Sequence, residues 1–578
     1  MLLLTLDTTR ADALGAFGGR GARTPVLDAL AARGTRWEQA IASTPLTLPA
    51  HSSLFTGLAP PEHGVETNGS TVLPRGLPTL AEAFFARRYA TAGFVASLVL
   101  DRRFGLARGF QHYDDRIPSE PSPGRHTLDR DARQMTDAAL EWLGRRPAGQ
   151  PVFLWVHYYD PHEWYLPADV KPEAGGAQRY AGQVAAMDRE IGRLLAALPG
   201  GAGRWLIAAV GDHGESLGEH GETGHGIFLY HATLHVPLVL AGPGVPRGRV
   251  IREAVATRRL ASTLLSLTAP GRAAAPFGAP LPGLPGLASG PPSPVYLASR
   301  YPLTAYGWSP LEGLFDGRFK LIVAPRPELY DLAADPGETR NLLDGPPEQR
   351  EPARGLKLEL AAVRRAFQIH PAEAADPELA NALQSLGYLS GTSTGTGGKG
   401  TLDPKDGVPL LAELKAAHEL VRQKGWQPAV VRLTELVRRS PGNGMFLLSL
   451  AQAQLASGDG DAALATFRRV VEDNPRHDDS HCQLADAYAR LGRGDDARQE
   501  YLLTLALNPR SFGAWWGLAD LAERAGNRAE VRALLTRAVE AGTESVSILR
   551  RLAEVEARAG DAAAAERYRA AARRLAGR

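Results

Sequence analysis

The pattern of apolar positions changes near residue 390. Before that point, short apolar runs typical of strands alternate with helical patterns. The predicted strands are Leu2–Leu6, Thr91–Ala96, Val152–Tyr158, Trp205–Val210 and Val236–Ala241, and the predicted helices include Val26–Arg33, Leu77–Arg87, Asp131–Arg145 and Tyr180–Leu198. This alternation predicts an α/β fold.

Segments rich in proline, glycine and serine mark the boundaries. Residues 269–294 predict a long surface loop, and the strand-like run Arg318–Ala324 after it favours a smaller subdomain. The stretch from Ser390 to Gly400 has the composition of a flexible linker. We therefore expect a first domain over residues 1–390, a linker over 391–408 and a second domain over 409–578.

The second region contains an internal repeat of 34 residues. The repeated positions are a proline at Pro441, Pro475 and Pro509, a glycine at Gly458, Gly492, Gly526 and Gly560, and an alanine at Ala451, Ala485, Ala519 and Ala553. Small residues let two helices of a hairpin approach closely, glycine suits the turn, and proline ends the second helix. The region resembles tetratricopeptide repeats, about four and a half copies from Leu410 to Arg578. The resemblance implies an all-α solenoid that binds a protein or peptide partner, although a solenoid that only packs on its own first domain stays open.

Composition narrows the classes of function. The chain has 65 basic and 63 acidic residues among 578, so no strong field attracts nucleic acid. The single cysteine excludes an internal disulfide and a cysteine-rich zinc site. No apolar run is long enough to span a bilayer. The first ten residues read as a core strand rather than a signal peptide, and a start further upstream stays open.

Three predicted strands end on polar clusters. These are Asp7 to Thr9, His157 to His162 and Gly211 to Glu215. Because ligands gather at the carboxyl ends of strands in open α/β sheets, we expect one site built from distant segments. Asp7, Asp212 and His213 would supply hard oxygens and one imidazole, which suit a divalent ion such as Mn²⁺, Mg²⁺, Ca²⁺ or Zn²⁺.

The stretch TPLTLPAHSSLFTG, residues 44–57, has two interpretations. In the structural one, an extended loop around Pro45 and Pro49 leads into a short helix that begins near residues 50–52. In the functional one, Thr47 is both a metal ligand and a nucleophile, because a metal bound to the hydroxyl lowers its pKa.

These motifs, with ELYDLAADPGETRNLL at residues 328–343, resemble the sulfatase and alkaline phosphatase superfamily from residue 1 to about 345, and more loosely to 390. The resemblance implies a central, mostly parallel sheet with helices on both faces and a small C-terminal subdomain. It also implies an anionic ester substrate and a periplasmic or extracytoplasmic location.

The nucleophile segment departs from the sulfatase pattern of Cys or Ser followed by x-Pro-x-Arg. Thr47 cannot become formylglycine, and His51 stands in place of the arginine. The segment is more similar to the T-F-P-N-H run of nucleotide pyrophosphatase/phosphodiesterases. Further along the chain, Asn68 matches an asparagine of that family that donates to non-bridging oxygens. The resemblance to lipoteichoic acid synthases, which have a single metal, implies Asp7, Thr47, Asp212 and His213 as the metal ligands.

Histidines are the remaining candidates for binding and proton transfer. By resemblance, His162 contacts substrate or protonates the leaving group, and His225 takes the place of a substrate-contacting lysine, for anion binding or acid–base work. His51 either stabilises the nucleophile loop or contacts the leaving oxygen, and both roles stay open. Asp160, His162 and His225 could hold a second metal, although one metal is favoured. His220 has no assigned role beyond bracing its loop.

The predicted function is a metal-dependent hydrolase that cleaves sulfate or phosphate esters through a covalent Thr47 intermediate. The mechanism favours phosphate esters or phosphonates, whereas the family resemblance favours sulfate esters. Two alternatives stay open: a non-catalytic repeat scaffold, and a transferase of phospho-groups onto a cell-envelope glycan or lipid.

Overall fold

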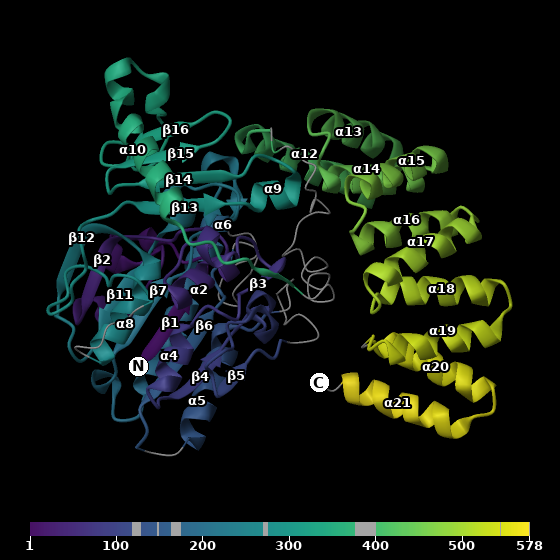
Figure 1. Ribbon diagram of the computed structural model, residues 1–578, viewed down its shortest axis with the longest axis horizontal. Helices are drawn as coiled ribbons and strands as arrows, with labels where there is room; N and C mark the ends of the chain where they lie inside the picture. Colours follow the sequence, from purple (N-terminus) through teal and green to yellow (C-terminus); the bar gives the residue numbers. More distant parts are fainter. Residues whose placement is uncertain are drawn as a thin grey trace. The chain divides into compact units, whose positions relative to one another are not determined.

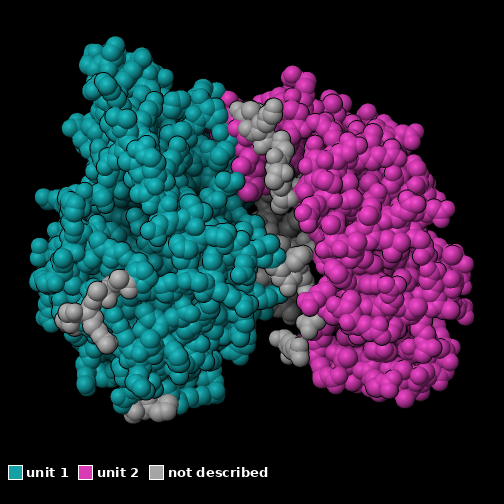
Figure 2. Space-filling model, viewed as in Figure 1, with its two compact units in different colours: residues 1–302, 309–376, 385–389 teal, residues 303–308, 377–384, 390–578 magenta. Residues whose placement is uncertain are grey.

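The computed structural model describes residues 1–117, 129–146, 149–162, 175–269, 276–375, 400, 402–543 and 545–576. The chain divides into two compact units, one α/β and one all-helical (Figures 1 and 2). The first consists mainly of residues 1–302 and 309–376. The second combines the repeat region with Leu303–Trp308.

The first unit is built on a nine-stranded sheet with the order β10-β2-β11-β7-β1-β6-β4-β5, and β12 pairs with β2. The strands are β1 (Leu2–Leu6), β2 (Thr35–Ile41), β4 (Ala90–Phe94), β5 (His112–Asp114), β6 (Val152–Tyr158), β7 (Ile207–Gly211), β10 (His235–Val236), β11 (Leu238–Ala241) and β12 (Arg249–Ala256). The run from β7 through β1, β6 and β4 to β5 is parallel, whereas β11 is antiparallel to β7 and β2. The predicted mostly parallel sheet is confirmed (Figure 1).

The predicted strands fit best in the middle of the sheet. β1 and β6 have the predicted bounds, because strands covered on both faces are continuously apolar. β2 and β12 were not predicted, because they mix apolar residues with charged, partly exposed ones. The strand predicted over Val236–Ala241 is present but interrupted: Pro237 lacks an N–H for the ladder, and β10 and β11 lie on either side of it.

Side chains that alternate along β1 place apolar residues on one face of the sheet and polar residues on the other. Leu2, Leu4 and Leu6 of β1 pack in one core with α1 (Pro25–Ala32), α5 (Ala132–Arg145) and α6 (Gly176–Ala196). Thr5 faces the other way, where its hydroxyl contacts His51 of α2 (Thr47–Thr56). Helices α4 (Leu80–Ala86) and α8 (Leu260–Thr268) pack beside α2 on that face. The helices on both faces are confirmed, and the α2 face carries the polar residues.

Helix α2 begins earlier than the structural interpretation of its sequence predicted. It starts at Thr47 rather than near residues 50–52, with Pro49 inside its first turn. This start costs no hydrogen bond, because the first N–H groups of a helix have no partner within it. All ten residues of α2 are buried, so both the threonine and the histidine of the motif lie inside the protein.

The subdomain is a four-stranded antiparallel sheet of β13 (Val295–Ser299), β14 (Leu311–Phe315), β15 (Phe319–Val323) and β16 (Glu328–Asp331). Helix α10 (Pro347–Ala366) shares a core with it through Leu356 and Leu360. The predicted strand at Arg318–Ala324 is confirmed as β15. The shorter elements are α3 (Pro60–His63), α7 (His231–Leu234), α9 (Tyr301–Tyr306), β3 (Thr71–Val72), β8 (Ser216–Leu217), β9 (Thr223–Gly224) and β17 (Glu373–Ala374).

The repeat region is a run of antiparallel helix pairs. In its described part the helices are α12 (Pro404–Arg422), α13 (Trp426–Arg439), α14 (Gly444–Ser457), α15 (Gly460–Asp473), α16 (Asp478–Arg490), α17 (Gly494–Leu507), α18 (Phe512–Arg524), α19 (Arg528–Glu540), α20 (Val546–Arg558) and α21 (Ala562–Ala576). These pair as five hairpins rather than four and a half, and α12 begins within the predicted linker. The glycines of the 34-residue period have φ of 91°, 77°, 72° and 87°, as the turn requires. Lys424 holds the same position in the first hairpin, with φ of 60°.

The domain bounds stay a prediction, because most of the linker lies outside the described residues. Residues 303–308 nevertheless belong to the same compact unit as the repeats. Trp308 is fully buried there, and its Nε1 donates to Ser440 Oγ over 3.1 Å. Among the helices that are described, none is long and apolar enough to cross a membrane.

Candidate active site

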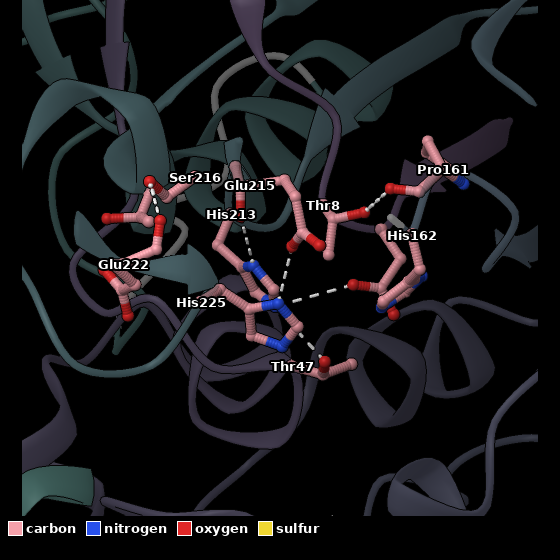
Figure 3. Close-up of polar contacts among 12 residues, drawn as sticks. Thr8, Thr47, Pro161, His162, His213, Glu215, Ser216, Glu222 and His225 are labelled. Atoms are coloured by element: carbon pink, nitrogen blue, oxygen red, sulfur yellow. Dashed lines mark hydrogen bonds and ion pairs between the residues drawn. The ribbon is translucent and has the colours of Figure 1, made fainter. Parts of the chain in front are cut away.

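Four residues predicted as metal ligands come together where β1 and β7 end beside the start of α2. His213 Nε2 lies 3.2 Å from Thr47 Oγ1, 3.4 Å from Asp7 Oδ1 and 3.6 Å from Asp212 Oδ2. The four side chains come from three segments far apart in sequence, with Asp212 and His213 adjacent, and each is at most 3% exposed. Figure 3 shows His213 directed towards Thr47.

The turn after β1 adapts its backbone to this site. Thr8 has a left-handed backbone with φ of 49°, which is unfavourable for a β-branched residue. Its N–H points to Asp212 Oδ1, 3.3 Å away, and its hydroxyl donates to the Pro161 carbonyl. The strained turn therefore ties the ends of β1, β6 and β7 together.

The carboxylates of Asp7 and Asp212 are buried close together, which disfavours their charged forms. Asp7 Oδ1 and Asp212 Oδ2 are buried and, within the described residues, accept no hydrogen bond. Burial raises the pKa of Asp7 well above its usual value, and Glu215 adds to the effect. Burial likewise raises the pKa of Asp212, and Asp7 adds to it. Two unpartnered carboxylate oxygens facing a common point are the donor set that a divalent cation would satisfy.

His213 is held in the tautomer that a metal ligand needs. Its Nδ1 lies 3.0 Å from the Gly214 carbonyl, an acceptor, so Nδ1 carries the proton and Nε2 presents a lone pair to the carboxylates. Burial lowers the pKa of His213 to about 4, so the ring is neutral at pH 7. The glycine next to it is also required, because a Cβ at Gly214 would lie 2.2 Å from the Ala232 carbonyl oxygen.

His157 is a site residue that the sequence reasoning missed. Its Nδ1 accepts the Ala96 N–H over 3.3 Å, so the proton is on Nε2, which donates to Asp7 Oδ2 over 3.1 Å. His157 also belongs to a second group with ligand-type geometry, His51, His157 and Asp212. The nitrogens of both histidines are engaged elsewhere, so the group of Asp7, Asp212 and His213 is the better metal candidate. His157 lies within β6 and is the first residue of the polar cluster His157 to His162, the one sequence signal that could have identified it.

Asn68 and His51 both contact the first turn of α2. Asn68 Oδ1 accepts the Leu48 N–H over 3.0 Å, which leaves the amide donors of Asn68 for another partner. His51 is fully buried, with Nδ1 2.8 Å from the Thr47 carbonyl oxygen and Nε2 3.0 Å from Thr5 Oγ1. His51 thus lies behind the nucleophile candidate.

His225 and His162 border the same region (Figure 3). The His225 ring lies 4.5 Å from that of His213 and 5.6 Å from that of His162. Its Nδ1 is 2.7 Å from Glu215 Oε2, a buried carboxylate that the sequence reasoning quoted but gave no role. His162 Nδ1 faces the Tyr159 carbonyl over 2.6 Å, and its ring stacks on Tyr159. With both Nδ1 atoms held by acceptors, each ring is fixed in orientation through its Nδ1.

The loop that carries His225 is clamped by Glu222. The two Glu222 oxygens accept the Ile227 N–H over 2.8 Å and the Phe228 N–H over 3.2 Å, while its carbonyl accepts from Ser216 Oγ (Figure 3). Burial raises the Glu222 pKa to about 8. In the sequence, only its place in a glycine-rich motif pointed to this carboxyl group.

Two further candidates contribute less to the site. His220 stacks on Tyr230 at 3.6 Å and, with φ of 53°, braces a turn beside a separate cavity of about 440 Å³. Among the described residues, Asp160, His162 and His225 do not form a group with metal-ligand spacing. Residues 163–174, which follow His162, lie outside the described part of the chain.

Comparisons with known families agree with this division of the chain. Residues 1–270 match the model described as Sulfatase, and residues 414–479 and 454–522 match two models described as Tetratricopeptide repeat. The chain combines an N-terminal domain of the sulfatase family with C-terminal tetratricopeptide repeats.

Two curated relatives are named as sulfatases. The chain is 23% identical over 411 residues to a Delta 4,5-hexuronate-2-O-sulfatase of Bacteroides thetaiotaomicron, covering 60% of this chain and 84% of the relative. It is 24% identical over 422 residues to the uncharacterized sulfatase YidJ of Escherichia coli, covering 59% and 82%.

Solved structures show the same fold. A 2-O GAG sulfatase aligns with a TM-score of 0.54 and 22% identity, over 66% of this chain and 96% of that one. The phosphonate monoester hydrolase of Agrobacterium radiobacter aligns with a TM-score of 0.50 and 23% identity, over 63% and 95%. The first unit is therefore an alkaline-phosphatase-like domain of a sulfatase-family hydrolase.

Proposed function

We propose that this sulfatase-family protein hydrolyses phosphate esters or phosphonates, with Thr47 as the nucleophile and one divalent cation held by Asp7, Thr47, Asp212 and His213. The observation that carries the proposal is the Thr47 hydroxyl at the start of α2, beside two buried carboxylate oxygens without hydrogen-bond donors. A scaffold with a degenerate site would have no reason to keep that costly arrangement.

The ligand set fits a cation on chemical grounds. Two carboxylates and the lone pair of a neutral imidazole supply hard oxygens and one nitrogen, which suit Mn²⁺, Mg²⁺, Ca²⁺ or Zn²⁺. A bound cation would lower the pKa of the threonine hydroxyl and offset charge on the reacting group. His157 supports the set by donating to Asp7, which fixes how that carboxylate is presented.

Thr47 begins the reaction and water completes it. Thr47 Oγ1 gives up its proton and forms a bond to phosphorus as the P–O ester bond breaks, and the leaving oxygen takes up one proton, so that the alcohol is released. Water then attacks the same phosphorus in line as the bond from phosphorus to Thr47 Oγ1 breaks; one water proton returns to Oγ1 and the hydroxyl stays on phosphorus. The start of α2 and the amide of Asn68 would bind the non-bridging oxygens.

His162 and His225 are the proposed groups for substrate contact and proton transfer. Glu215 orients His225 and stabilises the protonated ring. Burial lowers the His225 pKa to about 4, so it is neutral in the free protein. A phosphate or phosphonate anion beside it would favour its protonated form, which makes His225 an acid only after the substrate binds.

Threonine chemistry favours phosphorus over sulfur. Formylglycine cannot form from Thr47, so the covalent intermediate must be displaced by an acceptor rather than collapse by elimination. The similar proteins include sulfatases and a phosphonate monoester hydrolase, so their names support either ester class. We propose that the repeats bind a protein or peptide partner, as their family match suggests.

The test is a panel of nitrophenyl phosphate, phosphodiester, phosphonate and sulfate substrates, assayed with Mn²⁺, Mg²⁺, Ca²⁺ and Zn²⁺ in turn. We expect turnover of at least one phosphorus substrate by the wild type, its loss in Thr47→Ala, and its partial retention in Thr47→Ser, which keeps a hydroxyl. Turnover of sulfate alone would overturn the choice of phosphorus. Thr47→Ala activity within about tenfold of the wild type would remove Thr47 from the mechanism, since a lost nucleophile costs far more.

A further inference from the structure

A buried chain of hydrogen bonds runs from β6 through β1 to the first turn of α2. Trp155 Nε1 lies 2.9 Å from Thr5 Oγ1, Thr5 Oγ1 lies 3.0 Å from His51 Nε2, and His51 Nδ1 lies 2.8 Å from the Thr47 carbonyl oxygen. The side chains of Thr5, His51 and Trp155 are all fully buried. The chain ends on the backbone of the residue whose hydroxyl is the proposed nucleophile.

The chemistry of the groups gives this chain one direction. An indole N–H only donates, so Thr5 Oγ1 accepts from Trp155 and keeps its own proton to give. A carbonyl oxygen only accepts, so His51 Nδ1 must carry the proton that faces Thr47. A neutral imidazole has one proton, so His51 Nε2 accepts from the Thr5 hydroxyl. With a neutral His51, this is the arrangement in which every donor of the hydrogen-bond chain meets an acceptor.

We propose that His51 is a positioning residue for Thr47, held in its Nδ1-protonated tautomer by Trp155 and Thr5, and that it does not bind substrate. This inference rests on the proposed role of Thr47 as nucleophile. It decides between the two roles that the sequence left open for His51.

Geometry excludes the alternative role. Neither His51 nitrogen remains for a leaving oxygen, because one faces the Thr47 carbonyl and the other Thr5. His51 Nδ1 also lies 3.5 Å from Asp212 Oδ2, so this nitrogen faces acceptors of the protein on both contacts. A histidine with both ring nitrogens engaged thus occupies the position that the sulfatase pattern gives to an arginine.

The carbonyl that His51 holds belongs to the first residue of α2. Fixing that peptide fixes the direction of the Thr47 Cα–Cβ bond, and with it the line along which Oγ1 approaches phosphorus. Misplacing a reactive group by about 1 Å can cost about 100-fold in rate. The effect should therefore appear in kcat rather than in substrate affinity.

Thr5 provides the cleanest test, because it is remote from substrate and has two near-isosteric replacements. In the full-length metal-loaded protein, Thr5→Val removes the hydroxyl and Thr5→Ser keeps it. We expect Thr5→Val to lower kcat by about 10- to 100-fold with KM and metal content unchanged, and Thr5→Ser to stay within about threefold. Equal rates for both variants would overturn the proposal. A Thr5→Val loss fully accounted for by lost metal or by unfolding at the assay temperature would also overturn it.

A second pair of variants addresses His51 itself. His51→Asn keeps an N–H donor close to the position of Nδ1, whereas His51→Phe keeps only the ring. We expect His51→Asn to retain at least about tenfold more kcat than His51→Phe. Equal losses, or a raised KM in both, would indicate a different role.

A measurement without substrate separates this inference from the proposed function. Histidine ring ¹⁵N shifts of the labelled full-length protein, assigned by the signal lost in His51→Asn, report the tautomer. We expect protonated Nδ1 and unprotonated Nε2 near pH 7, with the pattern disturbed in Thr5→Val but not in Thr5→Ser. A protonated Nε2 would refute the hydrogen-bond direction even if no substrate were turned over. The expected tautomer in a protein with no esterase activity would refute only the proposed function.

Discussion

The candidate site and the repeat region use the same residue types, but their polar contacts differ in how far apart the partners lie in the sequence. At the site, His213 contacts residues more than 150 positions away along the chain, with every polar group buried. In the repeats, His481 bonds Glu500 in the adjacent helix and the carbonyl of Pro475, all within one 34-residue period. Polar residues at the site therefore depend on the whole fold, whereas those in the repeats depend on their neighbours. Replacing a histidine should therefore lower metal content and activity much more at the site than in the repeats.

The largest contrast is expected between two histidine variants. His213→Ala removes a proposed metal ligand, so metal content and kcat/KM should fall together, the rate by more than about 100-fold. His481→Ala removes the contacts with Glu500 and with the Pro475 carbonyl, all within the repeats, and should leave metal content and kcat/KM within about twofold. Elemental analysis and a nitrophenyl phosphate assay measure the two effects. Full metal occupancy in His213→Ala would contradict its role as a ligand.

A second contrast tests whether the repeats are complete without residues 303–308. A Cβ at Gly407 would lie 2.5 Å from the Trp308 ring, whereas a Cβ at Gly442 meets nothing within 4 Å. Gly407→Ala should lower the free energy of unfolding of the repeat unit by about 1–3 kcal/mol, the usual cost of overpacking. Gly442→Ala should change it by less than about 0.5 kcal/mol.

Urea unfolding followed by helix circular dichroism measures that second contrast. Equal stability of the two alanine variants would mean that Trp308 does not belong to the core of the repeats in solution. Gly407 lies inside α12, where alanine is by itself the better helix former and would raise the stability. A lower free energy of unfolding for Gly407→Ala would therefore have to come from the contact with Trp308.

The third contrast is between a buried and an exposed glutamate. Glu222 has its pKa raised to about 8 by burial. A carboxyl group with a raised folded pKa contributes stability that is complete below its ordinary pKa and is lost as the pH rises through the folded value. The unfolding free energy of the wild type relative to Glu222→Gln should therefore fall between pH 5 and about 9. Glu435→Gln, on the surface of α13, should show no such decline, because Arg438 lowers the Glu435 pKa. A constant difference for Glu222→Gln would refute the shift.

The smallest expected effect lies in the first repeat. Lys424 occupies with φ of 60° the turn position that the later repeats fill with glycine. Lys424→Gly should stabilise the repeat unit by up to about 1 kcal/mol by relieving the left-handed backbone. Gly458→Ala in the next repeat should destabilise it by a similar amount. Urea midpoints that move in the same direction in both variants would show that the turn does not set the preference.

The sequence predicted more of the repeats than of the site, for a physical reason. A hairpin of two helices has its turn, its close contacts and its end within 34 residues, so each requirement appears as a residue type at a fixed spacing. The turn glycines were predicted and all have positive φ. The first helix, α12, begins at Pro404, within the predicted linker of residues 391–408, because its first residues carry none of the repeated proline, glycine and alanine positions.

At the candidate site, the sequence provided the four residues proposed as metal ligands. Asp7, Thr47, Asp212 and His213 stand at strand ends and in recognisable motifs, and they come together as expected. It did not reveal His157 as the partner of Asp7, because nothing in the order of residues links two positions in neighbouring parallel strands. Only the register of β1 against β6 brings them together.

The sequence by itself determined the fold class, the repeat period and the identity of the polar groups, because these depend on local periodicity and motif spacing. The tertiary structure decided what each histidine does. His51, His157, His213 and His225 are the same residue type, and all four have lowered pKa values from burial. They differ in which ring nitrogen meets a donor or an acceptor, and that depends on contacts with distant strands and loops.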